Sequence, residues 1–193
     1  MVLWIFDNCS DTCYFLVVNN KLNYKGGFKM ARKVFFSFHY ERDAVRAGQV
    51  RNSNVVKNNS INTSDFIDAA KWEEIKKGGD EAIKRWIANQ LNGTSITVVL
   101  IGAKTSERKW VKYEIDESLK KGNGLLGIYI HKCPLFDGST DIKGENPFDN
   151  LYFNKNGLKK YLSQIYPTYD WIDDDGYNNL GDWIEKAAKE AGR

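Results

Sequence analysis

Glu114 is the acidic residue of this chain that is hardest to explain as part of an ordinary solvated surface. It lies in the segment Arg108 to Lys121, whose apolar spacing predicts an amphipathic helix. At about 100° per residue, Glu114 falls inside the apolar arc formed with Trp110 and Ile115, whereas the other acidic residues of the segment fall outside it. A carboxylate in such an arc must be ion-paired, hydrogen-bonded or used in chemistry. Periodicity alone favours a structural glutamate that bridges to a lysine or arginine, or that reaches solvent at the edge of the arc.

A second group of candidate site residues lies where the first predicted strand ends and its loop begins. It consists of Phe36, Ser37, Phe38, His39 and Tyr40. The aromatic rings can stack on a flat heterocycle, and the Ser37 hydroxyl can hydrogen-bond a phosphate or a ribose. Ordinary core packing of a strand is the simpler interpretation of the same residues. His39 can act as a general base, but no serine or cysteine lies in a recognisable nucleophile elbow, so a hydrolase triad has little support.

The motifs of several other reaction classes are missing from the sequence. Neither G-x-G-x-x-G nor G-x-x-x-x-G-K-[ST] occurs, which disfavours dinucleotide redox chemistry and P-loop phosphoryl transfer. The run Asp173-Asp174-Asp175-Gly176 lacks the ligand spacing of a calcium loop and is interpreted as a solvated turn. Three cysteines without C-x-x-C spacing and only two histidines indicate reduced thiols and no metal site.

Composition narrows the class of protein and of partner. With 193 residues, 42% of them hydrophobic, the chain can form one domain with a substantial core. The net charge is only +3, from 28 basic and 25 acidic residues, so neither nucleic acid nor an anionic membrane is an expected partner. No apolar run approaches the roughly 20 residues that cross a bilayer. We therefore expect a cytoplasmic protein.

The elements that must position these residues alternate between short apolar strands and amphipathic helices. Strands are predicted at Val34 to Phe38, Ile96 to Ile101 and Leu125 to Ile130, and helices at Glu81 to Leu91, Arg108 to Lys121 and Leu180 to Ala191. A polar segment at 41–51 leads to an expected loop at 52–64, and Asp65 to Ala69 is the best candidate for the second strand. Such alternation is typical of an α/β fold with an open parallel sheet. Ligands then bind at the carboxyl ends of the strands, here the loops after Phe38, Ile101 and Ile130.

Residues 1–29 differ from the rest of the chain. They carry two short apolar patches but neither the basic start nor the unbroken apolar region of a secretory signal. Met30 offers a second start, so we hypothesise that 1–29 is not part of the natural chain. An ordinary N-terminal extension is the alternative.

Taken together, these positions resemble a TIR domain. KVFFSFHYERD at Lys33 to Asp43 is similar to the first TIR box, and Trp110 to Glu114 matches the W-x-x-x-E spacing that carries the catalytic glutamate of NAD-cleaving TIR domains. The similarity is greater still to the TIR-like component ThsB of Thoeris antiphage systems, through WEEIKK at Trp72 to Lys77, TSITVVLIG at Thr94 to Gly102 and WVKYEI at Trp110 to Ile115. It covers residues 30–151 well, which leaves 152–193 as a family-specific C-terminal region of one domain, 30–193.

The resemblance implies a flavodoxin-like sheet with helices on both faces, NAD+ as substrate and no separate cofactor. Glu114 would hold the hydroxyls of the nicotinamide ribose and stabilise the oxocarbenium-like transition state. The substrate-binding residues would be Phe36, Ser37, Phe38, His39, Asp68, Trp72, Trp110 and Tyr113. Capture by a hydroxyl of the same molecule would give a cyclic ADP-ribose isomer, which activates the effector ThsA after a phage component triggers the system. Excluding water requires a closed site, which two packed copies in a homo-oligomer can provide.

Two features keep other functions open. The second TIR box, with its Pro-Gly loop, is not recognisable at 52–77, and many domains of this fold are interaction modules. A non-catalytic sensor or adaptor that binds a phage protein or other TIR domains is therefore the main alternative. A deoxyribosyltransferase-like enzyme, which shares the sheet type and a catalytic glutamate, is a weaker one.

Overall fold

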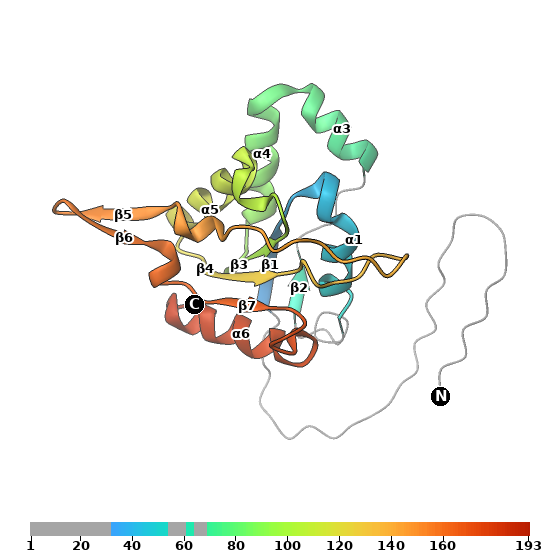
Figure 1. The fold of residues 1–193 in the computed structure, drawn as a ribbon. Coiled ribbons are helices and arrows are strands. Elements are labelled where there is room, and N and C mark those ends of the chain that lie inside the picture. The colour runs from blue at the N-terminus through green and yellow to red at the C-terminus, as the bar shows by residue number, and fades with distance from the viewer. Residues whose placement is uncertain (1–31, 54–60, 64–68) are drawn as a thin grey trace, which may run out of the picture.

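A parallel sheet forms the centre of the computed structural model, which describes residues 32–53, 61–63 and 69–193 (Figure 1). Its strands are β1 (Arg32–Ser37), β2 (Ile61–Thr63), β3 (Ile96–Ile101), β4 (Gly124–Tyr129) and β7 (Thr168–Asp170). Their order is β2-β1-β3-β4-β7, and every neighbouring pair is parallel. Counted along the chain this is 2-1-3-4-5, the flavodoxin-like order, whose direction of winding reverses between β1 and β3. The predicted α/β fold is confirmed.

Helices cover both faces of this sheet. They are α1 (Tyr40–Arg51), α3 (Ala69–Lys77), α4 (Gly79–Leu91), α5 (Lys109–Lys121) and α6 (Gly176–Glu190), with short 3-10 helices at Thr105–Glu107, Pro147–Asp149 and Leu162–Gln164. In Figure 1, α4 and α5 lie above the sheet and α6 lies below it. Side chains of α1 share one apolar cluster with those of α6, whereas α4 and α5 contribute to clusters on the opposite face. A hairpin of β5 (Tyr152–Lys155) and β6 (Leu158–Tyr161) projects from the side of the domain.

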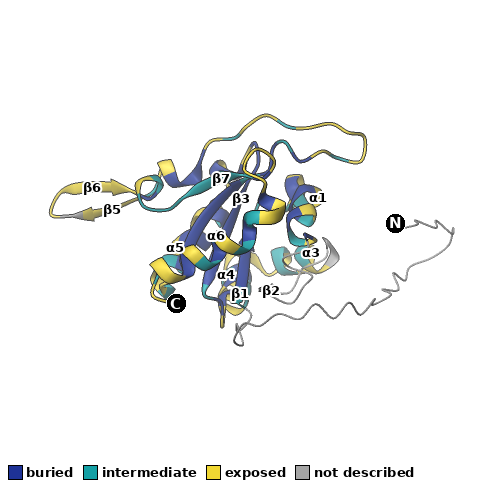
Figure 2. Ribbon diagram, turned by 90° about the horizontal axis from the view of Figure 1, so that it is seen from below, coloured by how far each residue is buried: buried dark blue, intermediate teal, exposed yellow. Residues whose placement is uncertain are grey.

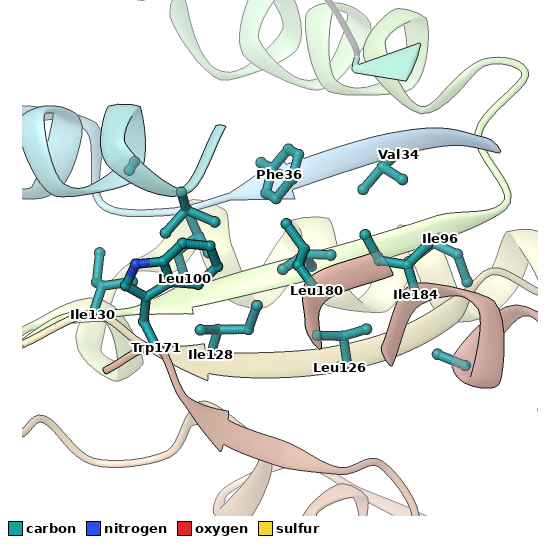
Figure 3. Close-up of a cluster of buried hydrophobic side chains, with 14 of the residues drawn as sticks. Val34, Phe36, Ile96, Leu100, Leu126, Ile128, Ile130, Trp171, Leu180 and Ile184 are labelled. Atoms are coloured by element: carbon teal, nitrogen blue, oxygen red, sulfur yellow. The ribbon is translucent and has the colours of Figure 1, made fainter. Parts of the chain in front are cut away.

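The alternation of side chains along β1 sends successive residues to opposite faces. Val34 and Phe36 pack with Leu180 and Ile184 of α6 in the cluster of Figure 3, while Phe35 packs against α4 on the other face. Burying each such side chain contributes about 1.5–3 kcal/mol. Strand β3 is buried along its whole length, as its uncharged, β-branched sequence predicts for a central parallel strand (Figure 2). The fold thus directs the end of β1 toward α5.

A buried carboxylate holds α1 against the loop that follows β3. Asp43 is fully buried and packs so closely on Gly102 that a Cβ there would overlap the carboxylate oxygens. Burial raises the pKa of Asp43 to about 6. This contact requires glycine at position 102 and places the first turn of α1 beside the chain leading to α5.

Several predicted boundaries need correction. The second strand is Ile61–Thr63, inside the segment expected to be a loop, and Ala69 begins a helix. The polar segment 41–51 is helix α1, whose buried face includes Asp43 and Arg46, so charges interrupt the apolar period on which the prediction depended. The final helix begins at Gly176 rather than Leu180. Strand β7 and the β5–β6 hairpin were not predicted, because β7 has three half-buried residues and the hairpin is largely exposed (Figure 2).

Two further predictions concern residues that the structure does not describe. The N-terminal segment 1–29 and Asp68 lie outside the described residues. Within the parts of the chain that are described, no helix is both long and apolar enough to span a membrane.

Candidate active site

Glu114 lies on the buried face of α5, next to the carboxyl end of β1. Its exposed fraction is 7%, and it shares that face with Val111, Ile115 and Ser118. The Ser37 hydroxyl, at the last residue of β1, donates a hydrogen bond of 2.5 Å to Glu114 Oε2. The prediction that Glu114 lies within the apolar arc of its helix is therefore confirmed. Glu114 also lies at the switch point of the sheet.

A cleft opens above this carboxyl group. Its empty volume is about 910 Å³, which includes open solvent at its mouth. Besides Glu114, it is lined by Phe35, Phe36, Phe38, His39, Tyr40, Glu41, Arg51, Trp72, Lys76, Trp86, Gln90, Arg108, Trp110 and Val111. The lining therefore combines one buried acid, a large aromatic surface and several basic groups.

Part of the aromatic lining is a connected set of rings from three helices and the loop before α1. Trp72 of α3 meets Trp86 of α4 edge to face at 5.6 Å between ring centroids, and it meets Tyr40 of α1 at 6.1 Å. Phe38 continues the set at 6.2 Å from Tyr40. Rings held by one another in this way present faces on which a flat heterocycle can stack.

Burial controls the charge of Glu114. Loss of water raises the pKa of its carboxyl to about 8, and the Ser37 hydrogen bond lowers it only in part. No lysine or arginine among the described residues contributes to this shift, so the structural alternative of a bridged glutamate is not seen there. At neutral pH, Glu114 of the free protein consequently holds a proton, and a ligand with positive charge near it favours the carboxylate.

Comparison with known proteins decides the family. A model of the TIR-like domain of the Thoeris protein ThsB matches residues 35–134. The Bacillus cereus (strain MSX-D12) protein named "Putative cyclic ADP-D-ribose synthase ThsB1" is 37% identical over an alignment of 193 positions, which spans 80% of this chain and 100% of that protein. The chain belongs to the ThsB TIR-like family.

The ThsB-type domain brings most of the predicted site residues together. Phe36, Phe38, His39, Trp72 and Trp110 line the cleft with Glu114. Ser37, for which a contact to phosphate or ribose was expected, is 1% exposed and bonds to Glu114 instead.

Besides Ser37, two more of the predicted residues are not among the lining of the described cleft. Tyr113 packs edge to face on Trp110, with 5.8 Å between ring centroids, and is not among the lining residues. Asp68 falls outside the residues that the structure of this ThsB-family domain describes.

Several cleft residues of this ThsB-family domain were not predicted. Glu41, Lys76 and Arg108 come from α1, α3 and the residue before α5, and their charges suggested solvated helix surface. Trp86 carried a detectable signal, because it lies at helical spacing with Ile83 and Ile87 on α4. Glu41, Lys76 and Arg108 carried no such signal in the sequence, because they come together only when three separate segments pack against one another.

The raised pKa of Glu114 predicts an unusual dependence of stability on pH. The folded protein keeps a proton on Glu114 up to about pH 8, whereas the unfolded chain releases it above about pH 4.5. The free energy of unfolding therefore falls as pH rises through that interval. Glu114→Gln removes this loss, so the variant should be more stable than the parent by about 4–5 kcal/mol at pH 8.5 and about equal at pH 4.5.

Denaturant unfolding at the two pH values measures this difference. Glu117→Gln is the matched control, because Glu117 lies on the same helix but pairs with Lys120 at 2.8 Å near the surface. A Glu114→Gln variant that is destabilised equally at both pH values would show that burial of the acid is not the cause.

Proposed function

We propose that this protein cleaves the bond between nicotinamide and ribose in NAD+ and forms a cyclic ADP-ribose isomer. The observation that carries the proposal is Glu114, a buried carboxyl group without a cationic partner among the described residues, which lines an aromatic cleft at the switch point of the sheet. The printed name of the Bacillus cereus relative supports the same reaction.

Glu114 has one main role in this reaction. As the C1′–N bond breaks, its electron pair leaves with nicotinamide and positive charge develops on the ribose ring. The Glu114 carboxylate offsets that charge and accepts hydrogen bonds from the ribose hydroxyls. Its proton passes to solvent water when the cationic nicotinamide ring binds, because a positive charge nearby favours the ionised form. Ser37 keeps the carboxyl group in place through its 2.5 Å hydrogen bond.

The cleft decides which nucleophile completes the reaction. Attack by water would give ADP-ribose, and attack by a hydroxyl of the same molecule would give the cyclic isomer; in both cases the attacking group releases one proton to solvent. Stacking of the nicotinamide or adenine ring on Trp72, Trp86 or Trp110 would fold the dinucleotide within the cleft and exclude water. Phe36, Phe38 and His39 complete this surface, while Tyr113 supports Trp110 from behind.

We place this activity in a Thoeris defence system in the cytoplasm. There a phage component would trigger the enzyme, and the nucleotide product would activate a ThsA effector. NAD+ is the substrate, and we propose no further cofactor. A homo-oligomer with a composite site would complete the exclusion of water.

Product analysis tests the proposal. The purified protein, alone and with extract of phage-infected cells, is incubated with NAD+, and the products are separated by chromatography and weighed by mass spectrometry. Nicotinamide and a product lighter than ADP-ribose by one water are expected. ADP-ribose alone would restrict the protein to hydrolysis. Release of no nicotinamide under either condition would contradict the proposal and favour the sensor or adaptor.

A further inference from the structure

Glu41 lies in the cleft where the basic groups of three segments meet. Its Oε1 is 3.3 Å from Lys76 Nζ, and its Oε2 is 3.8 Å from an Arg108 terminal nitrogen and 3.7 Å from His39 Nε2. All four residues line the cleft that Glu114 also lines. One carboxylate thus serves as the shared anion of this group.

The contacts that hold Glu41 are weak enough to be exchanged. Its side chain is 55% exposed, and only the Lys76 contact is short enough for a hydrogen bond. Lys76 has a second acidic partner, Glu73, at 2.6 Å, so Glu41 is not needed to hold the Lys76 side chain in place. Exposed pairs of this kind contribute little to stability.

The groups around Glu41 suit an anion with more oxygens than a carboxylate. Arg108 and Lys76 supply guanidinium and ammonium donors, the usual partners of phosphate. The two ring nitrogens of His39 are buried without a hydrogen-bond partner, and burial is the largest cause that lowers the pKa of this imidazole. A neutral imidazole has one N–H to donate, and an approaching anion favours its protonated form, which has two.

We infer that His39, Lys76 and Arg108 form an anion subsite for the diphosphate of a dinucleotide, and that Glu41 occupies this subsite until the substrate displaces it. The inference rests on the proposed function, because NAD+ is the dinucleotide expected to reach Glu114. With its diphosphate held here, the substrate extends along the aromatic lining toward Glu114 in the same cleft. Glu41 then acts as a competing anion, which the diphosphate must displace from Lys76, Arg108 and His39.

Glu41→Gln tests the subsite because it removes the competing charge and keeps the shape of the side chain. The KM for NAD+ should fall about two- to fivefold, the effect of one exposed ion pair. Arg108→Gln should raise KM about tenfold, since a charge-assisted contact to phosphate is lost. Glu81→Gln is the matched control: it is an exposed helical glutamate paired with Lys84 at 2.7 Å, and it is not among the cleft residues.

Calorimetric binding of ADP-ribose and of inorganic pyrophosphate separates this inference from the proposed reaction, because it needs no turnover. Both ligands should bind Glu41→Gln more tightly than the parent, and more weakly as salt increases. Nicotinamide, which has no phosphate, should bind both proteins equally. Tighter ADP-ribose binding without NAD+ cleavage would uphold the subsite and contradict the proposed function. Unchanged or weaker binding of ADP-ribose to Glu41→Gln would overturn the subsite, whatever the activity.

Discussion

Glu114→Gln is expected to reduce the rate of nicotinamide release from NAD+ by about 10²–10³-fold, the size of effect that follows removal of one group that stabilises transition-state charge. The substitution keeps the size of the side chain and an acceptor oxygen for the Ser37 hydroxyl, which lies 2.5 Å from Glu114 Oε2. It removes the negative charge that offsets the developing charge on the ribose. The loss should therefore appear in kcat, with a smaller change in KM.

Loss of folding cannot account for such a result. Glu114 is a buried acid whose ionisation opposes folding at alkaline pH, so the glutamine variant is expected to be the more stable protein there. Glu117→Gln, on the same helix but paired with Lys120 near the surface, should retain the parent rate within about twofold. Equal nicotinamide release by the parent and Glu114→Gln would remove this residue from the mechanism.

The sequence predicted the framework of this site better than its lining. Strand β3 has the predicted bounds, Ile96–Ile101, because a run of uncharged β-branched residues has few alternatives to a buried parallel strand. Helix α5 follows the prediction to within one residue, and its Gly122 ends it in the left-handed conformation at φ 74°. The position of Glu114 within an apolar arc therefore translated directly into burial.

Features that depend on packing between distant parts of the chain were harder to predict from the sequence. Helix α1 buries Asp43 and Arg46, so its inner face does not have an apolar period. The pairing of Ser37 with Glu114 joins residues 77 positions apart, and Lys76 reaches Glu41 across 35 positions. Spacing along one element cannot predict such contacts, because they depend on which elements become neighbours in the sheet.

The value of kcat/KM for NAD+ cleavage is expected to rise about tenfold per pH unit below pH 8 and to level off above it. This ratio reports ionisation of the free enzyme, in which burial raises the pKa of Glu114 to about 8, and only the carboxylate form can offset positive charge on the ribose. At pH 6 the ratio should therefore be about 10²-fold below its plateau. Its measurement from pH 5.5 to 9.5 gives the midpoint directly. A profile that is flat across pH 8 would contradict a protonated Glu114 in the free enzyme.

Ser37→Ala assigns that midpoint to Glu114. The Ser37 hydrogen bond lowers the pKa of the Glu114 carboxyl, so its removal should move the rise in kcat/KM upward by about one pH unit. Thr97→Val is the matched control, since it also deletes a buried hydroxyl, one that lies 2.7 Å from Ser118 Oγ and does not touch the Glu114 side chain. If Ser37 has only a structural role, Ser37→Ala should behave like Thr97→Val. Both variants would then lower the plateau of kcat/KM without moving the midpoint of its rise. A shift confined to Ser37→Ala therefore ties the hydroxyl at the end of β1 to the ionisation that the reaction requires.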